Sequence, residues 1–484
     1  MPEIEKMIFN GINAVTGEYL LPPMTVDEIA SIIKGEKKEK KVLTWLAEVW
    51  HKIRTTYMGL PVGVEPSDVA QAGWGIVFHK DESPAVKAAL QPLIDHRRQQ
   101  INNDAVVKEL EYRPGEKWEE WLGRYSVAPG SVEPGKIPFY LLLVGDPAVI
   151  SFEFGHLLDV EYSVGRLHFN SPEEYATYAA SVIEYETAAA VPNRKEAVFF
   201  APRHAFDQAT QMSADYLINP LVDGLPGDGG QPAQPGVAAQ WGYPFQKIWG
   251  SAATREALHN AITPPAGSGP PAFLFTASHG IGFPKDHANQ KAAQGALVCQ
   301  DWPGFGGIQP SHYFSAADIS AESRVHGMVI FHFACYGGGT PASDLYVHKA
   351  GQAPPQIASQ PFLASLPKAW LTHPGGSALA VIGHVERAWG YSIIAPHAGP
   401  QIQTFQNTIG RILIGQPLGY ALKDFNERYA ALSTGLASML QKAGWGEQVD
   451  SQALATRWIE RNDAEGYVLI GDPAVKLRAA ELSV

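Results

Sequence analysis

Short hydrophobic runs recur along most of the chain, and they alternate with stretches whose hydrophobic residues are spaced as on one face of a helix. Runs of this length that are apolar throughout are typical of strands buried on both faces of a parallel sheet. The clearest runs are FYLLLVGDP (139–147), AVFFA (197–201), AFLFTA (272–277), GMVIFHFA (327–334), SALAVIG (377–383) and GYVLIGDP (466–473). This alternation predicts an α/β fold, in which a mostly parallel sheet is flanked by helices.

The first 130 residues have a more polar pattern, and their hydrophobic positions favour helices. Residues 40–53 place their hydrophobic side chains on one amphipathic face. Residues 83–101 predict a second helix, which Ser83 caps and Pro92 bends or interrupts. We therefore expect a mainly helical region over residues 1–130.

Composition shifts suggest where the remaining boundaries lie. Residues 224–236, GLPGDGGQPAQPG, are rich in glycine and proline and are typical of a surface loop or subdomain boundary. We therefore expect a smaller α/β subdomain over residues 131–236 and a larger one over residues 237–484. The sequence GDPAV follows a predicted strand at residues 145–149 and again at 471–475. We favour turn chemistry for this repeat over a trace of two related subdomains.

Composition and charge narrow the function classes. The chain has 484 residues, of which 45% are hydrophobic, so it can bury a large core. Its net charge of −12, with no long cluster of arginine and lysine, argues against nucleic acid as a partner. Cys299 and Cys335 are too few for a disulfide framework, and we recognise no secretory leader and no membrane-spanning run of ~20 apolar residues. We therefore expect a cytoplasmic protein with no membrane partner.

Reactive side chains follow two of the predicted strands. TASHGIG (276–282) brings His279 to a strand end, and FHFACYGGG (331–339) does the same for Cys335. Because reactive groups gather at the carboxyl ends of parallel strands, the two side chains should meet at one edge of the sheet. The histidine can then favour the thiolate, while the N–H groups of Gly280 and Cys335 can stabilise an oxyanion. Gly337 and the next two glycines would leave room for a peptide.

The alternative interpretations are weaker. A free cysteine at a strand end is by default inert packing, but a neighbouring strand that ends in His-Gly outweighs that default. Cys299 lacks such a setting, and His332 lies inside a strand, where histidines are usually core residues. We find no G-x-S-x-G turn, no phosphate-binding loop and no histidine pair at metal-ligand spacing. The sequence therefore predicts no cofactor and no metal.

The order of these motifs resembles the caspase-like cysteine peptidases, and the gingipain branch is the most similar. LLLVGDPAVISFEFGHLLDVEYSVGRLHF (141–169) resembles the segment before the catalytic subdomain of gingipains, and YVLIGDPAVKLR (467–478) resembles the end of that domain. The resemblance covers residues 137–478. It implies a caspase-like fold, a catalytic subdomain over residues 237–484, Cys335 as the nucleophile and His279 as the base.

The resemblance also implies further site residues. Glu153 is the candidate for a glutamate near the catalytic histidine, and Asp159 for an aspartate in the primary specificity pocket, although their spacing to residues 164–166 departs from the gingipain pattern. Asp159 in that pocket implies a basic residue before the scissile bond. Trp389 resembles an aromatic residue that packs on the side chain before that bond. Arg387 in the same loop would instead suit an acidic substrate, so specificity stays open.

We therefore expect a cysteine endopeptidase that hydrolyses a protein or peptide substrate through an acyl-enzyme, with a preference for basic residues. One alternative is a catalytically silent scaffold or binding module, and another is an acyltransferase or peptide ligase that uses the same dyad. The first 130 residues could be a regulatory segment, a pro-segment cut near residues 34–41 or at Arg97-Arg98, or the site of a regulatory partner.

Overall fold

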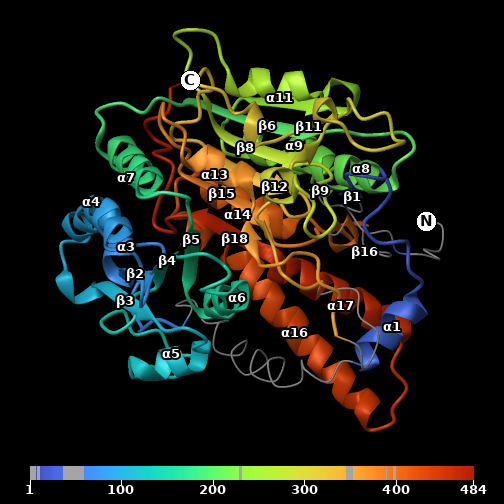
Figure 1. Cartoon of the computed structure of the whole chain (residues 1–484), viewed down its shortest axis with the longest axis horizontal. Helices are drawn as coiled ribbons and strands as arrows, with labels where there is room; N and C mark the ends of the chain where they lie inside the picture. The colour runs from blue at the N-terminus through green and yellow to red at the C-terminus, as the bar shows by residue number, and fades with distance from the viewer. Residues whose placement is uncertain are drawn as a thin grey trace.

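One large sheet with helices on both faces forms the centre of the molecule (Figure 1). The computed structural model describes Met7 and residues 11–35, 59–227, 232–344, 353–388, 390–395 and 399–483. The large sheet contains β2 (Trp74–His79), β3 (Val107–Tyr112), β4 (Tyr140–Val144), β5 (Ser163–Leu167), β6 (Arg194–Ala201), β7 (Phe245–Trp249), β8 (Pro271–Ala277), β12 (Val329–Phe333), β15 (Ala380–His384) and β18 (Tyr467–Gly471).

Strand direction divides this sheet into two halves. The strand order is β3-β2-β4-β5-β18-β15-β12-β8-β6-β7, and the first five of these strands run parallel to one another, as do the last five. The halves meet at the antiparallel pair of β15 and β18, where His384 lies opposite Tyr467. The mostly parallel α/β sheet expected from the sequence is confirmed. Because each half is parallel, its strand ends collect at a common edge.

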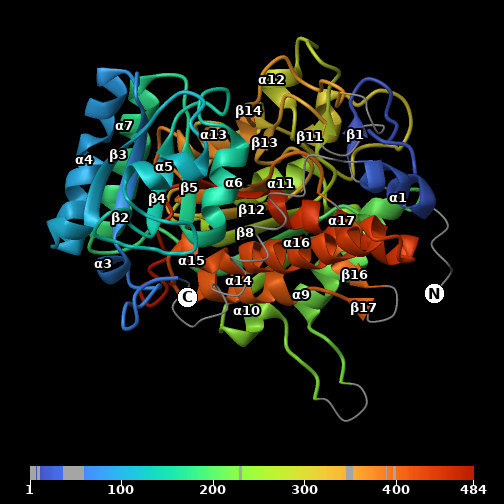
Figure 2. The same cartoon turned by 90° about the horizontal axis from the view of Figure 1, so that it is seen from below.

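Helices cover both faces of the sheet. In Figure 2, α14, α15 and α16 lie along one face and α13 lies on the opposite one. The α-helices are α1 (Val26–Gly35), α3 (Val69–Ala72), α4 (Pro84–Ile101), α5 (Trp118–Arg124), α6 (Phe152–Glu161), α7 (Pro172–Thr187), α8 (Gln208–Met212), α9 (Asn219–Asp223), α10 (Val237–Gln240), α11 (Arg255–Ile262), α12 (Gln290–Ala293), α13 (Ser365–Leu371), α14 (Gln403–Leu413), α15 (Leu418–Ala421), α16 (Lys423–Gly444) and α17 (Ser451–Gly466). Within the part of the chain that the structure describes, no helix is long and apolar enough to span a membrane.

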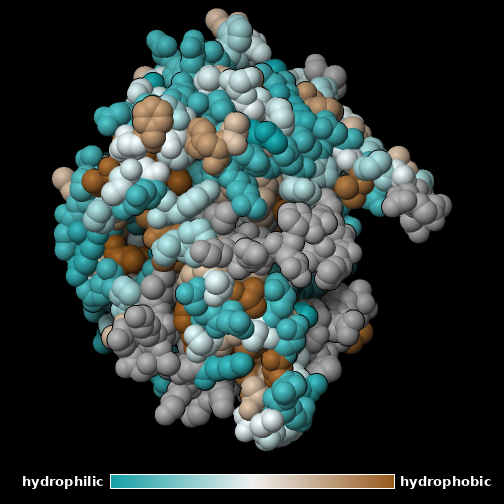
Figure 3. All heavy atoms as spheres, turned by 90° about the vertical axis from the view of Figure 1, so that its right-hand side faces the viewer, coloured by the Kyte–Doolittle hydropathy of each residue, from teal (hydrophilic) through white to brown (hydrophobic). Residues whose placement is uncertain are grey.

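Pairs of short strands lie outside the large sheet. These strands are β1 (Ile12–Asn13) with β9 (Ile281–Gly282), β10 (Leu297–Val298) with β11 (Tyr313–Phe314), β13 (Gly339–Thr340) with β14 (Phe362–Leu363), and β16 (Ile394–Ala395) with β17 (Gly399–Pro400). The first pair joins the beginning of the chain to the loop after β8. The side of the molecule on which β1 and α1 lie carries mostly hydrophilic side chains, and its hydrophobic areas are small and separate (Figure 3).

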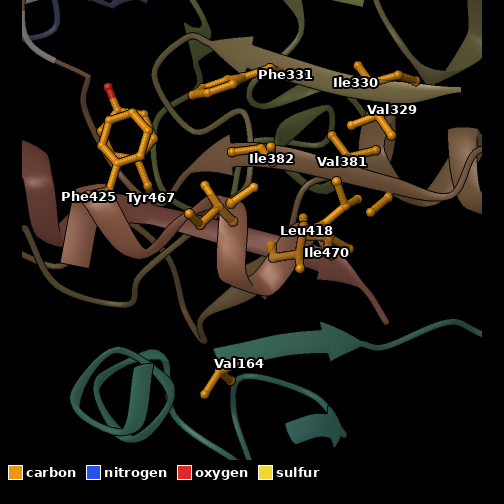
Figure 4. Packing of buried hydrophobic residues seen from close by; sticks show 14 of the residues in the cluster. Val164, Val329, Ile330, Phe331, Val381, Ile382, Leu418, Phe425, Tyr467 and Ile470 are labelled. Atoms are coloured by element: carbon orange, nitrogen blue, oxygen red, sulfur yellow. The ribbon is translucent and has the colours of Figure 1, made fainter. Parts of the chain in front are cut away.

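Aromatic and branched side chains pack where the two halves of the sheet meet (Figure 4). Phe331 of β12 lies 6.0 Å from Phe425 of α16, measured between ring centroids, and Phe425 lies 4.1 Å from Tyr467 of β18. Phe331 and Ile382 are 0% exposed. Phe331 thus anchors β12 against α16. β12 ends at Phe333, two residues before Cys335, so this packing supports the position of the cysteine.

The first 130 residues differ from the expected helical region. The helix expected over residues 83–101 is present as α4, capped by the Ser83 side chain, and it continues through Pro92. However, β2 and β3 join the large sheet, because the buried residues 74–78 pair with β4 and residues 74–79 pair with β3. Residues 40–53 lie outside the described residues. The expected boundary after residue 236 also differs, since β6 pairs with both β7 and β8 across it.

The two GDPAV sequences form the same turn in different places. Asp146, after β4, accepts a hydrogen bond from the Ala148 N–H over 2.9 Å, and Asp472, after β18, accepts one from the Ala474 N–H over 3.0 Å. Aspartate side chains commonly bond the backbone two residues further on in turns. The repeat therefore fits turn chemistry.

Candidate active site

His279 and Cys335 lie at the ends of two adjacent strands of one parallel half. β8 and β12 pair through Ala277 and Phe333, and the pairing continues beyond the strands, because the Ser278 N–H donates to the Phe333 carbonyl over 3.1 Å. A Cβ on Gly280 would lie only 1.7 Å from the carbonyl oxygen of Cys335. The His-Gly sequence is therefore required by a close backbone approach between the two loops.

Asp207 holds the far side of the His279 ring. It precedes α8, in the loop after β6, and its Oδ2 lies 2.7 Å from Nε2 of His279. Burial acts to raise the pKa of Asp207, but the attraction of His279 and the hydrogen bonds from His279, Tyr19 and Thr210 together outweigh it and keep this pKa well below its usual range. Asp207 was not among the site residues that the sequence predicted. The signal that could have found it is an acidic residue shortly after the strand beside β8.

The beginning of the chain contacts the same histidine. The Gly11 N–H donates to Nδ1 of His279 over 3.0 Å, so Nδ1 is unprotonated and Nε2 carries the proton that is donated to Asp207. The hydroxyl of Tyr19 donates to Oδ1 of Asp207, and the Tyr19 ring meets the His279 ring edge-on at 5.9 Å. Gly11 and Tyr19, which are distant from His279 in the sequence, therefore both contact its ring.

The Cys335 thiol is enclosed. Cys335 is 0% exposed, and its Sγ lies 3.7 Å from the carbonyl oxygen of Ala388, to which the thiol donates. Burial raises the pKa of the Cys335 thiol to about 12. In this arrangement the thiol is protonated at neutral pH. Cys299 is also buried and donates to the Leu297 carbonyl, as expected for a packing residue.

Two carboxylates expected at the site lie elsewhere. Glu153 is exposed in the first turn of α6, and the carboxylate beside His279 is instead Asp207. Asp159 lies on α6 and accepts a hydrogen bond from the Val164 N–H over 2.7 Å, which holds the turn into β5. Burial raises its pKa to about 6, although Lys423 opposes this shift. Its carboxylate is engaged in the fold, so its position does not fit the expected substrate pocket.

The expected substrate-binding residues after β12 and β15 also differ from the prediction. Arg387 is 3% exposed and makes a two-pronged ion pair with Asp344, over 2.8 and 2.6 Å, and a third bond to Glu386. A guanidinium neutralised in this way does not attract an acidic substrate. The Gly337 N–H donates to the carbonyl of Ala334 three residues before it in the turn, rather than lining an open channel. Trp389 lies outside the described residues.

The glycines after Cys335 have a packing role. The Gly338 N–H donates to the His384 carbonyl over 2.9 Å, and a Cβ on Gly383 would lie 2.6 Å from the Gly338 nitrogen. The glycines therefore let the loop after β12 lie directly on the backbone of β15. His332 is a core residue, with Nδ1 2.8 Å from the Thr276 hydroxyl and Nε2 3.2 Å from the Trp370 indole nitrogen.

The chain matches one protein family and is similar to several solved structures. The model of peptidase family C25 matches residues 74–478. Among solved structures, the chain is similar to the Arg-specific cysteine proteinase gingipain R (RgpB), at 13% identity with a TM-score of 0.44, over 84% of this chain and 79% of the other. It is also similar to the complex of Porphyromonas gingivalis RgpB pro- and mature domains, at 13% identity with a TM-score of 0.43, over 84% and 80% of the two chains. No relative was found among curated proteins.

Proposed function

The chain belongs to peptidase family C25, the gingipain family, and is a cysteine-type peptidase; from this premise we propose that Cys335, His279 and Asp207 form its catalytic group. The observation that carries the assignment is the His279 ring, held by Asp207 at Nε2, with Nδ1 accepting from Gly11, where a Cβ would lie 3.1 Å from the Cys335 sulfur. A cysteine nucleophile needs such an oriented base.

The proposed reaction is peptide hydrolysis in two stages. Nδ1 of His279 takes the thiol proton, and the Cys335 sulfur attacks the carbonyl carbon of the scissile bond while the carbonyl electrons move onto oxygen. The N–H groups of Gly280 and Cys335 stabilise that oxyanion. When the C–N bond breaks, the protonated histidine gives its proton to the leaving nitrogen. Water then attacks the thioester, which releases the carboxylic acid and restores the thiol.

The finer part of the proposal is a preference for a basic residue before the scissile bond. Its support is the chain's net charge of −12, which attracts cationic peptides over distance. Asp159 does not supply this support, because its carboxylate is bonded to the backbone. Arg387 does not favour the opposite preference, since Asp344 and Glu386 neutralise it.

One observation favours a second candidate, the catalytically silent scaffold. The Cys335 thiol is enclosed and its pKa is raised to about 12, so the resting form lacks a thiolate. The scaffold hypothesis takes this as the permanent state of the protein. The peptidase hypothesis requires the thiol to become accessible and its pKa to fall.

The test is cleavage of fluorogenic peptides that differ only in the residue before the scissile bond. Cys335→Ala should abolish cleavage, and the matched control Cys299→Ala, which removes the other buried thiol, should leave it unchanged. Cleavage after arginine or lysine supports the full proposal, and cleavage only after other residues overturns the basic preference. Cleavage that persists in Cys335→Ala overturns the assignment of the nucleophile.

We further propose a cytoplasmic setting. Cys299 and Cys335 are both unpaired, which suits a reducing compartment. Fractionation of the source cells, with the chain detected by antibody, tests this proposal. Recovery from an oxidising compartment would contradict it.

A further inference from the structure

A hairpin formed by residues 11–21 lies across the catalytic site. Its first arm is β1, which runs parallel to β9, with Ile12 beside Ile281. Its second arm pairs back on the first, because the Leu20 N–H donates to the Gly11 carbonyl over 3.0 Å. β1 lies beside β9 in Figure 1 as well, close to α8. The 11–21 hairpin therefore adds a strand to the loop that directly follows the catalytic histidine.

The 11–21 hairpin contacts every residue of the proposed catalytic group. The Gly11 N–H donates to Nδ1 of His279 over 3.0 Å, and a Cβ on Gly11 would lie 3.1 Å from the Cys335 sulfur. The Tyr19 hydroxyl donates to Asp207. With the hairpin in place, Cys335 and His279 are 0% and 1% exposed. A peptide substrate and the hairpin cannot occupy this site together.

The position of the Gly11 nitrogen matches that of a leaving group. In acyl transfer, the histidine that takes the thiol proton returns it to the nitrogen of the departing amine. The Gly11 nitrogen lies at hydrogen-bonding distance from that ring atom, Nδ1 of His279. The chain from Gly11 onward therefore runs where the residues after the scissile bond of a substrate would run. Its pairing with β9 is the strand addition by which many proteins bind extended peptides.

An apolar cluster receives alternate side chains of this arm. Ile12 and Ala14 are 2% and 4% exposed, while Asn13 between them is only partly buried. The cluster around Ile12 and Ala14 includes Ile281, Ala293, Val298, Trp302, Ile308 and Tyr313. Alternation of this kind is how a strand-addition site selects side chains. The second and fourth positions of the bound strand are therefore apolar.

We propose that the β9 edge and this apolar cluster bind the part of a peptide substrate that follows the scissile bond, and that the 11–21 hairpin occupies this site as an internal inhibitor. The inference rests on the proposed peptidase function. It implies that an apolar residue is favoured two positions after the scissile bond, and that cleavage requires the hairpin to leave. The hairpin lies outside residues 74–478, which match the family, so it is an addition to the matched region.

Close contacts identify the variants that should release the hairpin. Gly11 has a φ of +99°, and a Cβ there would lie 2.7 Å from a methyl group of Leu20, so Gly11→Val should push the hairpin off the site. Ile12→Asp places a charge in the apolar cluster and should have the same effect. Val15 is in the same hairpin but 50% exposed, so Val15→Asp is the matched control.

The readout is the rate at which iodoacetamide labels Cys335 in the full chain, followed by mass spectrometry, with Cys299 as the internal reference. Gly11→Val and Ile12→Asp should raise this rate about tenfold or more, and Val15→Asp should leave it unchanged. A synthetic peptide of residues 11–21 should protect Cys335 again in Gly11→Val. The same peptide carrying Ile12→Asp should not protect it.

The outcomes separate the two hypotheses. Faster labelling with no peptide hydrolysis would sustain the hairpin inference and overturn the peptidase function. Hydrolysis and rapid labelling in the wild-type chain, equal to those of Gly11→Val, would sustain the peptidase and overturn the inhibitor. Hydrogen exchange of the Gly11 amide in the wild-type chain adds a test that needs no variant. Slow exchange is expected, and exchange as fast as at exposed positions would overturn the inference.

Discussion

Asp207 and His279 are 72 residues apart in the sequence, yet Oδ2 of the aspartate lies 2.7 Å from Nε2 of the histidine. β6 and β8 are adjacent strands of one parallel half, so the loops that follow them meet at the same edge. The aspartate fixes the ring orientation and the tautomer, because Nε2 donates to it while Nδ1 accepts from Gly11. The neighbouring strands β8 and β12 then bring Cys335 to the same edge.

Replacing Asp207→Asn should lower kcat about 10²–10⁴-fold, because the amide no longer fixes the tautomer or stabilises a protonated His279. The measurement is peptide hydrolysis by the Gly11→Val background, in which the site should be open. Asp215→Asn is the matched control, since Asp215 lies on the next turns of the same helical segment and pairs with Arg203. A kcat equal to that of the parent would contradict the role of Asp207.

The labelling of Cys335 in the wild-type chain should keep rising with pH beyond pH 10. Burial raises the pKa of this thiol to about 12, and the thiolate is the reactive form. The rate for an ordinary cysteine peptide should level off above its own pKa of about 8.5. The measurement is the iodoacetamide rate between pH 7 and 10.5, with such a peptide as reference. A plateau of the Cys335 rate near pH 8 would contradict the enclosed thiol.

Replacing Arg97→Met should destabilise the chain by about 3–5 kcal/mol, because it leaves Asp472 buried without its cation. Arg97 is 0% exposed and bonds both Asp472, over 2.8 Å, and Glu186, over 2.6 Å. Arg98→Met is the matched control, since the Arg98 side chain is 42% exposed and its ion pairs are at the surface. The measurement is urea unfolding. Equal midpoints for the two variants would argue against a buried network.

The same contacts place Arg97 inside a packed helix, where autoprocessing at Arg97-Arg98 is not expected.

Stability should fall as the pH drops from about 5 toward 2. Burial acts to raise the pKa of Glu186, but the attraction of Arg97 and the hydrogen bonds from His96 and Arg97 together outweigh it and lower this pKa from 4.5 to about 2. The stabilisation is therefore fully present above the unfolded value and is lost as the pH falls through the folded one. With Glu186→Gln, the free energy of unfolding should fall by about 3 kcal/mol less over this pH range than it does in the wild-type chain. A decline as steep as that of the wild-type chain would exclude Glu186 as its source.

Replacing Gly280→Ala should lower both stability and activity. The added Cβ would lie 1.7 Å from the Cys335 carbonyl oxygen, so the loops after β8 and β12 must separate, at a cost of about 1–3 kcal/mol or more. Gly123→Ala is the control, because a Cβ there meets no neighbour in α5 and should stabilise the helix by up to about 1 kcal/mol. Thermal unfolding and peptide hydrolysis of both variants check this. Normal activity of Gly280→Ala would contradict the close approach.

Local patterns were sufficient for the strands that carry the site. AFLFTA and GMVIFHFA are almost entirely apolar, which predicted the buried strands β8 and β12, and parallel strands gather their ends at one edge. His279 and Cys335 could therefore be brought together from the sequence. β2 was missed because its run of six residues lies in a polar region, where tertiary pairing with β4 decides the conformation.

Side-chain partners were decided by tertiary structure. Glu153 and Asp159 are carboxylates near the expected positions, but the direction of α6 exposes one and ties the other to Val164. Arg387 could equally have faced a substrate, and the carboxylates of Asp344 and Glu386 neutralise it instead. Such outcomes depend on which charged groups the fold buries together, and that is a property of contacts between distant segments.

The sequence by itself determined the α/β class, the two strand ends and the cysteine and histidine at them, because hydrophobic runs and glycines act within a few residues. Only the tertiary structure decided that Asp207 orients the histidine and that Gly11 closes the site. The Gly11 contact spans 268 residues. No local periodicity encodes such a contact, since it depends on the pairing of β1 with the distant β9.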